Sequence, residues 1–276
     1  MLLLDAHVHY YPCFDQTTFF QSAFNNFEST AISMGLTDYT PIIILADWSK
    51  ICWFQHFFNL GNDDINQLAN VQSPFTFEPT EEELSVSVSF GSKKIIIVAG
   101  RKIITAENLE VLALCTNNRF KDGLTLNETV VDIASKNAVP IIPWAAGKWL
   151  GKRGEILLNL IGESSKNDFL LCDNGNRPNV WKYPNHFKIA EKKGFRIISG
   201  SDPLHFPSEV NRTGSFGFCI DKDIDLGSPA NDIKQILSDP DLKTQHYGKL
   251  ESFSRFIRNQ AIMQLFGRKW KKELMK

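Results

Sequence analysis

Two histidines near the amino terminus have the spacing of metal ligands. The segment Asp5-Ala6-His7-Val8-His9 ends a short apolar run, and strand alternation places Asp5, His7 and His9 on one face. Two imidazoles about 7 Å apart on one strand can converge on a cation at about 2.1 Å from each nitrogen. The pattern favours a divalent metal site over two separate core or surface histidines.

A second candidate ligand lies far along the chain. Residues 196–205 read as a strand that enters a glycine-containing turn and presents Asp202. A carboxylate there would complete a His, His, Asp set with one position left for water, as a catalytic metal site requires. An Asp that caps the turn before Pro203 explains the same residues equally well.

Other predicted strand ends carry charged and aromatic side chains. Residues 143–154 place Lys148, Lys152 and Arg153 among glycines, where they could hold a phosphate or carboxylate beside Trp144. A solvated basic loop is the alternative. The further candidates are Asp47 and Lys102 for catalysis, Asp173 and Arg177 for substrate contact, and Glu110 and His205 for the metal.

Short apolar runs alternate with amphipathic stretches, which is typical of parallel βα units. Strands are predicted at 2–8, 41–46, 95–99, 109–115, 139–143, 169–172 and 195–199. Helices are predicted at about 15–34, 126–137, 154–162, 184–193 and 246–267, with a hairpin-like insertion near 62–91. This order indicates a single domain over 1–276, a distorted TIM-like (β/α)7 barrel, with a doubly wound open sheet as the alternative. In either fold, functional groups collect after the carboxyl ends of the strands.

Composition narrows the partners. The chain has 30 basic and 31 acidic residues, so no general charge attracts it to nucleic acid or to an anionic membrane. Its five scattered cysteines form no disulfide or zinc pattern, and from the sequence pattern we expect neither a signal peptide nor a membrane span. We therefore expect a cytoplasmic protein that binds a small anionic substrate, with no nucleic acid or membrane partner and with no prediction of oligomeric state.

In this order the motifs resemble the PHP family, the polymerase and histidinol phosphatase superfamily of metal-dependent phosphoesterases. The resemblance covers residues 3 to about 205. Asp5-Ala6-His7-Val8-His9 is similar to the family's D-x-H-x-H, and Gly200-Ser201-Asp202-Pro203-Leu204 is similar to its G-S-D-A-H. The other matching segments are Leu45-Ala46-Asp47-Trp48 (T-D-H), Gly100-Arg101-Lys102 (G-x-E), Glu110-Val111-Leu112-Ala113-Leu114 (H-x-L-A-L) and Ile141-Ile142-Pro143-Trp144 (a strand ending in His-Pro).

The departures from this family reduce the expected number of metal ions. The family assembles two or three ions, but here Lys102 replaces the bridging glutamate and Glu110 replaces a histidine. Trp48, Trp144 and Leu204 also stand at histidine positions, with His205 one place late. The resemblance then implies one zinc, manganese or iron ion on His7, His9 and Asp202, with Glu110 and His205 as further ligands.

Three functions are compatible with these residues. The preferred one is a metal-dependent hydrolase, a phosphoesterase that attacks its substrate with a metal-activated water, with Asp202, Lys102 and Asp47 at the reaction centre. The second is a catalytically degenerate PHP-like domain that binds a ligand or a protein. The third is an amidohydrolase-like enzyme in which a carboxylated Lys102 bridges two metals, because that family also combines H-x-H with a late Asp.

Overall fold

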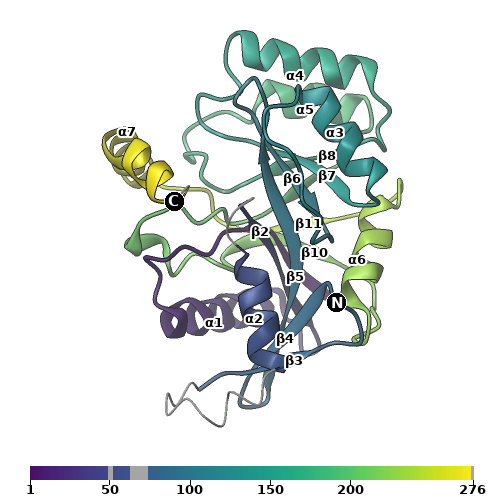
Figure 1. Ribbon diagram of the computed structural model, residues 1–276, viewed down its shortest axis with the longest axis vertical. Helices are drawn as coiled ribbons and strands as arrows, with labels where there is room; N and C mark the ends of the chain where they lie inside the picture. Colours follow the sequence, from purple (N-terminus) through teal and green to yellow (C-terminus); the bar gives the residue numbers. More distant parts are fainter. Residues whose placement is uncertain (49–51, 63–73, 275–276) are drawn as a thin grey trace.

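The computed structural model describes residues 1–48, 52–62 and 74–274. Its centre is a curved sheet with the strand order β11-β10-β1-β2-β5-β6-β7-β8-β9 (Figure 1). The strands on this path are β1 (Leu2–Val8), β2 (Thr40–Asp47), β5 (Lys93–Ile104), β6 (Glu110–Leu114), β7 (Val139–Pro143), β8 (Leu170–Asp173), β9 (Ile197–Ser199), β10 (Phe216–Ile220) and β11 (Gln245–Gly248).

The sheet is nearly closed into a barrel. Just beyond β9, the backbone N–H of Asp202 donates to the carbonyl of His7 in β1, at 2.7 Å. The last strand of the path thus returns to the carboxyl end of β1, while β10 pairs with the amino half of β1. The α/β barrel predicted from the sequence is confirmed.

Seven helices in the described residues cover the barrel. They are α1 (Gln16–Met34), α2 (Trp53–Asn62), α3 (Leu126–Ser135), α4 (Lys152–Glu163), α5 (Asn185–Lys192), α6 (Pro229–Ser238) and α7 (Phe253–Leu274). Figure 1 shows α6 and the N-terminus on one side of the barrel and α7 on the opposite side. None of these helices is long and apolar enough to cross a membrane.

Local sequence explains where α1 begins and ends. The Asp15 side chain accepts a hydrogen bond from the backbone N–H of Thr18 at 2.8 Å, which satisfies a donor of the first turn. Gly35 ends the helix with a φ of 69°, a conformation that costs glycine no strain. Between them, the buried residues are Phe19, Phe20, Ala23, Phe24, Phe27 and Ala31, at helical spacing. This stripe attaches α1 to the outside of the barrel.

Buried apolar side chains form one inner core and two outer ones. The inner core includes Leu2, Leu4 and Ala6 of β1 together with side chains of the other barrel strands and α6. Leu3 and Val8 instead pack outside, against α1 and α2. The second outer core lies between strands β5 to β9 and helices α3, α4 and α5.

Several elements differ from the sequence prediction. Strand β6 runs antiparallel to both β5 and β7, because residues 105–109 form a tight connection that is too short for a parallel crossover. The predicted helix at 246–267 begins only at Phe253, since Gln245–Gly248 pair with β10. The pattern also missed α2, α6 and β10.

The predicted hairpin region is partly described. β3 (Thr76–Pro79) and β4 (Ser85–Phe90) pair antiparallel, and β4 continues antiparallel along β5. Residues 63–73 of the predicted insertion lie outside the described residues. The pair extends the barrel sheet beside β5.

Candidate metal centre at the barrel mouth

A bulge in β1 aims its two histidines into the barrel. Asp5 pairs with Ile43 and Val8 with Leu45, so β1 gains one residue over β2 between these points. Strict alternation, which would keep Asp5 on the histidine face, is therefore wrong. The Asp5 carboxylate instead accepts hydrogen bonds from the backbone N–H groups of Ser201 and Gly214, at 2.7 and 2.8 Å.

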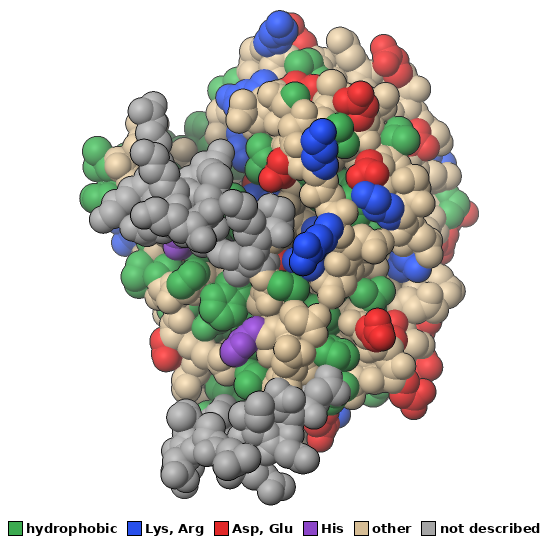
Figure 2. All heavy atoms as spheres, viewed as in Figure 1, with side chains coloured by type: hydrophobic (Ala, Val, Ile, Leu, Met, Phe, Trp, Pro, Cys, Tyr) green, Lys and Arg blue, Asp and Glu red, His purple; other side chains and the backbone are tan. Residues whose placement is uncertain are grey.

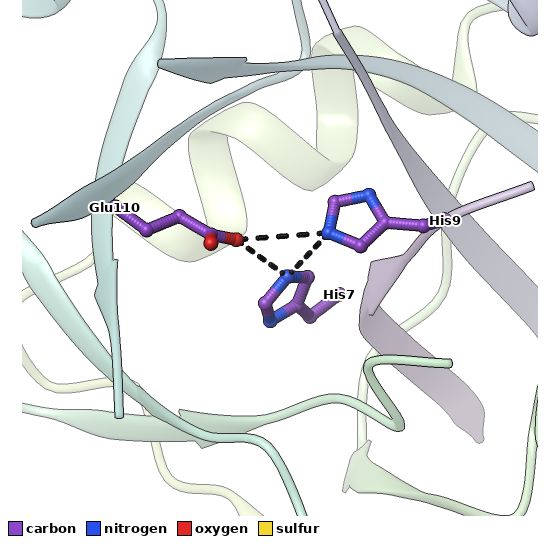
Figure 3. Close-up of side chains that lie close together, drawn as sticks. All are labelled: His7, His9 and Glu110. Carbon is purple, nitrogen blue, oxygen red and sulfur yellow. Dashed lines mark hydrogen bonds and ion pairs between the residues drawn. The ribbon is translucent and has the colours of Figure 1, made fainter. Parts of the chain in front are cut away.

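Two imidazoles and one carboxylate converge at the mouth of the barrel. His7 Nε2 lies 3.0 Å from His9 Nε2 and 3.2 Å from Glu110 Oε1, and the third separation, His9 Nε2 to Glu110 Oε1, is 3.6 Å. Figure 3 shows all three side chains pointing toward one another. Atoms bound about 2.1 Å from a tetrahedral ion lie about 3.4 Å apart, so this metal trio (His7, His9 and Glu110) has the dimensions of a ligand set.

Glu110 reaches the trio because β6 is antiparallel. It is the first residue of β6, which places it at the same end of the barrel as the carboxyl ends of β1 and β2. Ile104 of β5 lies directly across from it. A parallel strand would have carried Glu110 to the opposite end of the barrel, so the antiparallel direction creates the site.

The surroundings of His9 keep its Nε2 available as a ligand atom. Its Nδ1 lies 2.7 Å from the carbonyl oxygen of Ala46, a pairing that requires the proton on Nδ1. Burial, followed by the positive charge of Lys102, lowers the pKa of His9 to about 4. The imidazole is thus neutral at pH 7, with the Nε2 lone pair directed at the trio.

Glu110 is ionised despite being buried. Burial by itself would raise its pKa, but the charges of Lys102 and Lys148 hold the pKa well below its usual value. The Nζ atoms of these lysines lie 2.8 and 3.3 Å from Oε2 of Glu110. One carboxylate oxygen therefore faces the lysines, and the other faces the histidines.

The donor set fits a metal ion. Glu110 Oε1 is buried and accepts no hydrogen bond from the described residues, although two imidazole nitrogens lie within 3.6 Å of it. Nitrogen and carboxylate oxygen together suit zinc, manganese and iron. Among the described residues, the trio is the one group of three or more such side chains whose ligand atoms lie within 4.8 Å of one another.

Asp202 lies at the edge of the trio. Its Oδ1 is 3.5 Å from His7 Nε2 and 3.7 Å from His9 Nε2. Its Oδ2 accepts hydrogen bonds from the side-chain amides of Asn174 and Asn176, at 2.7 and 3.2 Å. A φ of 44° at Asp202, uncommon outside glycine, aims the carboxylate back at the histidines.

A cavity of about 290 Å³ opens above the trio. Its volume is at the small end of ligand pockets, which run from about 300 to 1,000 Å³. Helix α7 forms one wall through Gln260, Met263 and Gly267. The other polar and aromatic lining residues are Tyr11, Trp48, Lys102, Glu110, Trp144, Lys148, Asn174, Asn176, Asp202 and His205.

Several predicted site residues do line this cavity. Lys102, Lys148 and Trp144 are among them, and Nζ of Lys102 also lies 4.9 Å from the ring centroid of Trp48. His205 stands in the wall with its ring stacked on Tyr11 at a centroid distance of 4.5 Å. It is not a member of the metal trio, so its prediction as a ligand has no support from the geometry.

Asp47, predicted to be catalytic, makes a structural contact at the start of α2. Its Oδ2 accepts a hydrogen bond from the backbone N–H of Phe54 at 2.8 Å and so satisfies the first turn of α2. Burial raises the pKa of Asp47 to about 7. Asp47 is the last residue of β2, and it is not among the residues that line the cavity.

Four residues predicted to hold substrate lie outside the cavity wall. Arg177 pairs with Asp173 at 2.8 Å, and both side chains are buried. Arg153 donates to the carbonyl of Gly147 at 2.9 Å, and Lys152 is exposed on the first turn of α4. None of the four lines the cavity.

Sequence reasoning missed the amides that position Asp202. Asn174 and Asn176 belong to a segment rich in turn formers, which reads as structural. Their signal is the place of the segment directly after β8, at the mouth of the barrel. The contribution of α7 has no signal in the sequence, since it depends on how the chain folds back over the barrel.

Comparisons with known proteins show a similarity of fold. No protein-family model and no curated protein sequence matches this chain. The fold is similar to that of PsfC from Pseudomonas syringae PB-5123, with a TM-score of 0.52 and 13% identity over 97% of this chain and 98% of that one.

Two further solved structures are endonucleases. The lesion-specific endonuclease PfuEndoQ from Pyrococcus furiosus has a TM-score of 0.47 and 11% identity, over 88% of this chain and 57% of that one. A complex of Endonuclease Q with a 27-mer duplex substrate has a TM-score of 0.38 and 12% identity, over 85% and 55%. This chain therefore spans little more than half of either endonuclease.

These neighbours correct one prediction. The sequence analysis excluded nucleic acid and expected a small anionic substrate, yet the matched solved structures include an Endonuclease Q complex with a 27-mer duplex substrate. The exclusion was wrong because it relied on net charge, which says nothing about local basic sites. Fold and site together define an α/β barrel with a candidate metal centre at the carboxyl ends of its strands.

Proposed function

We propose that this chain is a metal-dependent hydrolase that cleaves phosphate esters, with a PHP-like barrel. The observation that carries the proposal is the convergence of His7 Nε2, His9 Nε2 and Glu110 Oε1 within 3.0 to 3.6 Å. When bound there, a divalent ion would supply Lewis-acid chemistry and lower the pKa of water. Asp202 is the residue placed to hold a proton or a fourth ligand position beside the histidines.

The charges in the cavity suit a phosphate ester. Lys102 and Lys148 balance Glu110 and Asp202, so a divalent ion leaves an excess of two positive charges. Lys148 is 32% exposed, so its ammonium can contact both Glu110 and a phosphoryl oxygen. Trp144 is buried in the wall and limits the entry of bulk water.

A second candidate is a degenerate domain that binds its ligand without turnover. Lys102 supports it, because its Nζ lies 2.8 Å from Glu110 Oε2 and 3.4 Å from His9 Nε2. A positive charge thus already neutralises Glu110, the carboxylate of the trio. The same contact disfavours the amidohydrolase-like alternative, because a carboxylated Lys102 would place a negatively charged group next to the Glu110 carboxylate.

The test combines metal analysis with a substrate panel. Elemental analysis of purified protein should find close to one divalent ion per chain, and His7→Ala and His9→Ala should each lose it. His56→Ala is the matched control, because His56 is an exposed histidine on α2. The panel holds a phosphomonoester, a phosphodiester, and single- and double-stranded DNA.

Each outcome decides between the candidates. Metal that is lost in the two variants, together with hydrolysis of any phosphate ester, supports the hydrolase. Bound metal without turnover supports the degenerate domain. Full metal content in His7→Ala would end the assignment of the trio.

A further inference from the structure

A polar hollow lies apart from the metal centre, where the start of α7 meets the segment after β9. It is lined by Ser208, Asn211, Arg212, Ser215, Arg255 and Arg258. All six side chains carry hydrogen-bond donors, three are arginines, and none is acidic. An arginine fork matches the oxygens of a phosphate group, so this lining suits a phosphate.

Buried carboxylates hold two of these arginines in place from behind. Arg212 Nη1 lies 2.7 Å from Glu251 Oε2, and Arg255 Nη2 lies 2.8 Å from Glu209 Oε1. Glu209 and Glu251 are 0% and 6% exposed. The guanidinium groups are thus fixed before any ligand arrives, which lowers the entropy cost of binding.

The charge of the hollow stays positive after this pairing. Three arginines face two glutamates, so one positive charge remains, and within the described part of the chain the Arg258 side chain makes one long contact, of 3.5 Å, with the Asn259 side chain. Figure 2 shows acidic and basic side chains interspersed over the face it draws, in keeping with the overall charge of −1. Attraction for an anion at the hollow is therefore local.

The hollow is coupled to the metal centre by two structural links. Arg212 Nε donates to the carbonyl of Ser201 at 2.7 Å, and the next residue is Asp202. Helix α7 borders the two spaces with opposite faces, because Gln260 and Met263 stand in the cavity wall whereas Arg255 and Arg258 line the hollow. A ligand that occupies both must extend around this helix beyond the cavity, which holds about 290 Å³.

We propose that the hollow binds a backbone phosphate of a nucleic acid strand, another unit of which enters the cavity. This inference rests on the proposed phosphoesterase function, and it names the substrate class as a polymer of phosphodiesters. A strand carries a phosphate at every nucleotide, which supplies the second anion without a second molecule. Contacts of this kind position a strand without reading its sequence.

The experiment measures binding separately from turnover. Fluorescence anisotropy of a labelled single-stranded DNA oligonucleotide is recorded with the full chain and EDTA, between about 50 and 200 mM salt. Arg258→Gln should weaken binding roughly 5- to 10-fold and reduce the slope of log K against log salt by about 0.7. Arg119→Gln is the matched control, an exposed arginine far from the hollow in sequence, and should change neither.

A second arm separates a strand from free phosphate. Inorganic phosphate is titrated at constant ionic strength against the wild type and Arg258→Gln. If phosphate binds the wild type only, while both proteins bind the oligonucleotide equally, the hollow is a site for free phosphate and the proposal fails. It also fails if neither protein binds the oligonucleotide. Neither result would contradict the hydrolase proposal, because that proposal is tested by metal content and ester cleavage.

Discussion

Replacing Lys102 with methionine should tighten the binding of a divalent ion to the metal trio. Methionine keeps an unbranched side chain but removes a positive charge whose Nζ lies 3.4 Å from His9 Nε2 and 2.8 Å from Glu110 Oε2. Two effects of opposite sign meet here. The lysine repels a cation at the trio, yet it also holds Glu110 in place and ionised.

The magnitudes favour repulsion as the larger effect. Two unit charges about 4 Å apart interact by about 4 kcal/mol at an effective dielectric constant near 20, and a divalent ion feels more. A hydrogen bond to a charged group is worth about 1.5 to 3 kcal/mol, and Lys148 still contacts Glu110 in the variant. We expect a net gain of about 2 kcal/mol, or a roughly 30-fold lower Kd for the metal.

The assay is a competition titration of apoprotein with zinc or manganese against a chelating dye. Lys148→Met is the matched control, because Lys148 contacts the same oxygen but is 32% exposed, whereas Lys102 is 10% exposed. Water screens the more exposed charge, so its removal should change Kd less than about 5-fold. Weaker metal binding in Lys102→Met than in the wild type would refute the reasoning and make Lys102 a support for Glu110.

Two further predictions concern buried charges away from the trio. Because burial raises the pKa of Asp47 to about 7, the folded protein keeps this proton where the unfolded chain has lost it, and stability falls between about pH 4 and pH 7. The free energy of unfolding, measured with denaturant at about pH 5 and pH 8, should differ between the two pH values by on the order of 2–3 kcal/mol less in Asp47→Asn than in the wild type. The same difference in both proteins would contradict this prediction. Arg177→Met should destabilise the protein by about 3–5 kcal/mol, since it leaves the buried Asp173 unpaired. Lys136→Met is the control; it removes an exposed ion pair with Asp132 and should cost less than about 0.5 kcal/mol of stability. Equal loss of stability in the two variants would contradict a stabilising role for the buried Arg177–Asp173 pair.

Local patterns determined much of this protein. The alternation of apolar runs and amphipathic stretches predicted seven of the nine strands on the barrel path, because these strands are largely buried on both faces and their apolar runs are visible in the sequence alone. The rule that functional groups follow strand ends selected His7, His9 and Asp202. In the structure, the Nε2 atoms of the two histidines and Oδ1 of Asp202 lie within 3.7 Å of one another. Glu110 was predicted as a ligand because it begins the segment that resembles the family's H-x-L-A-L motif.

Tertiary structure decided which of the other candidates share the site. A one-residue bulge sends Asp5 to a different face from His7, and Asp47 accepts a hydrogen bond at the start of α2 and does not line the cavity. The antiparallel direction of β6 brings Glu110 to the mouth. Strand direction, register and the path of α7 depend on contacts between residues far apart in sequence. Residue type and spacing do not predict such contacts, because strand direction, register and helix path are set by packing between distant segments, which forms only when the chain folds.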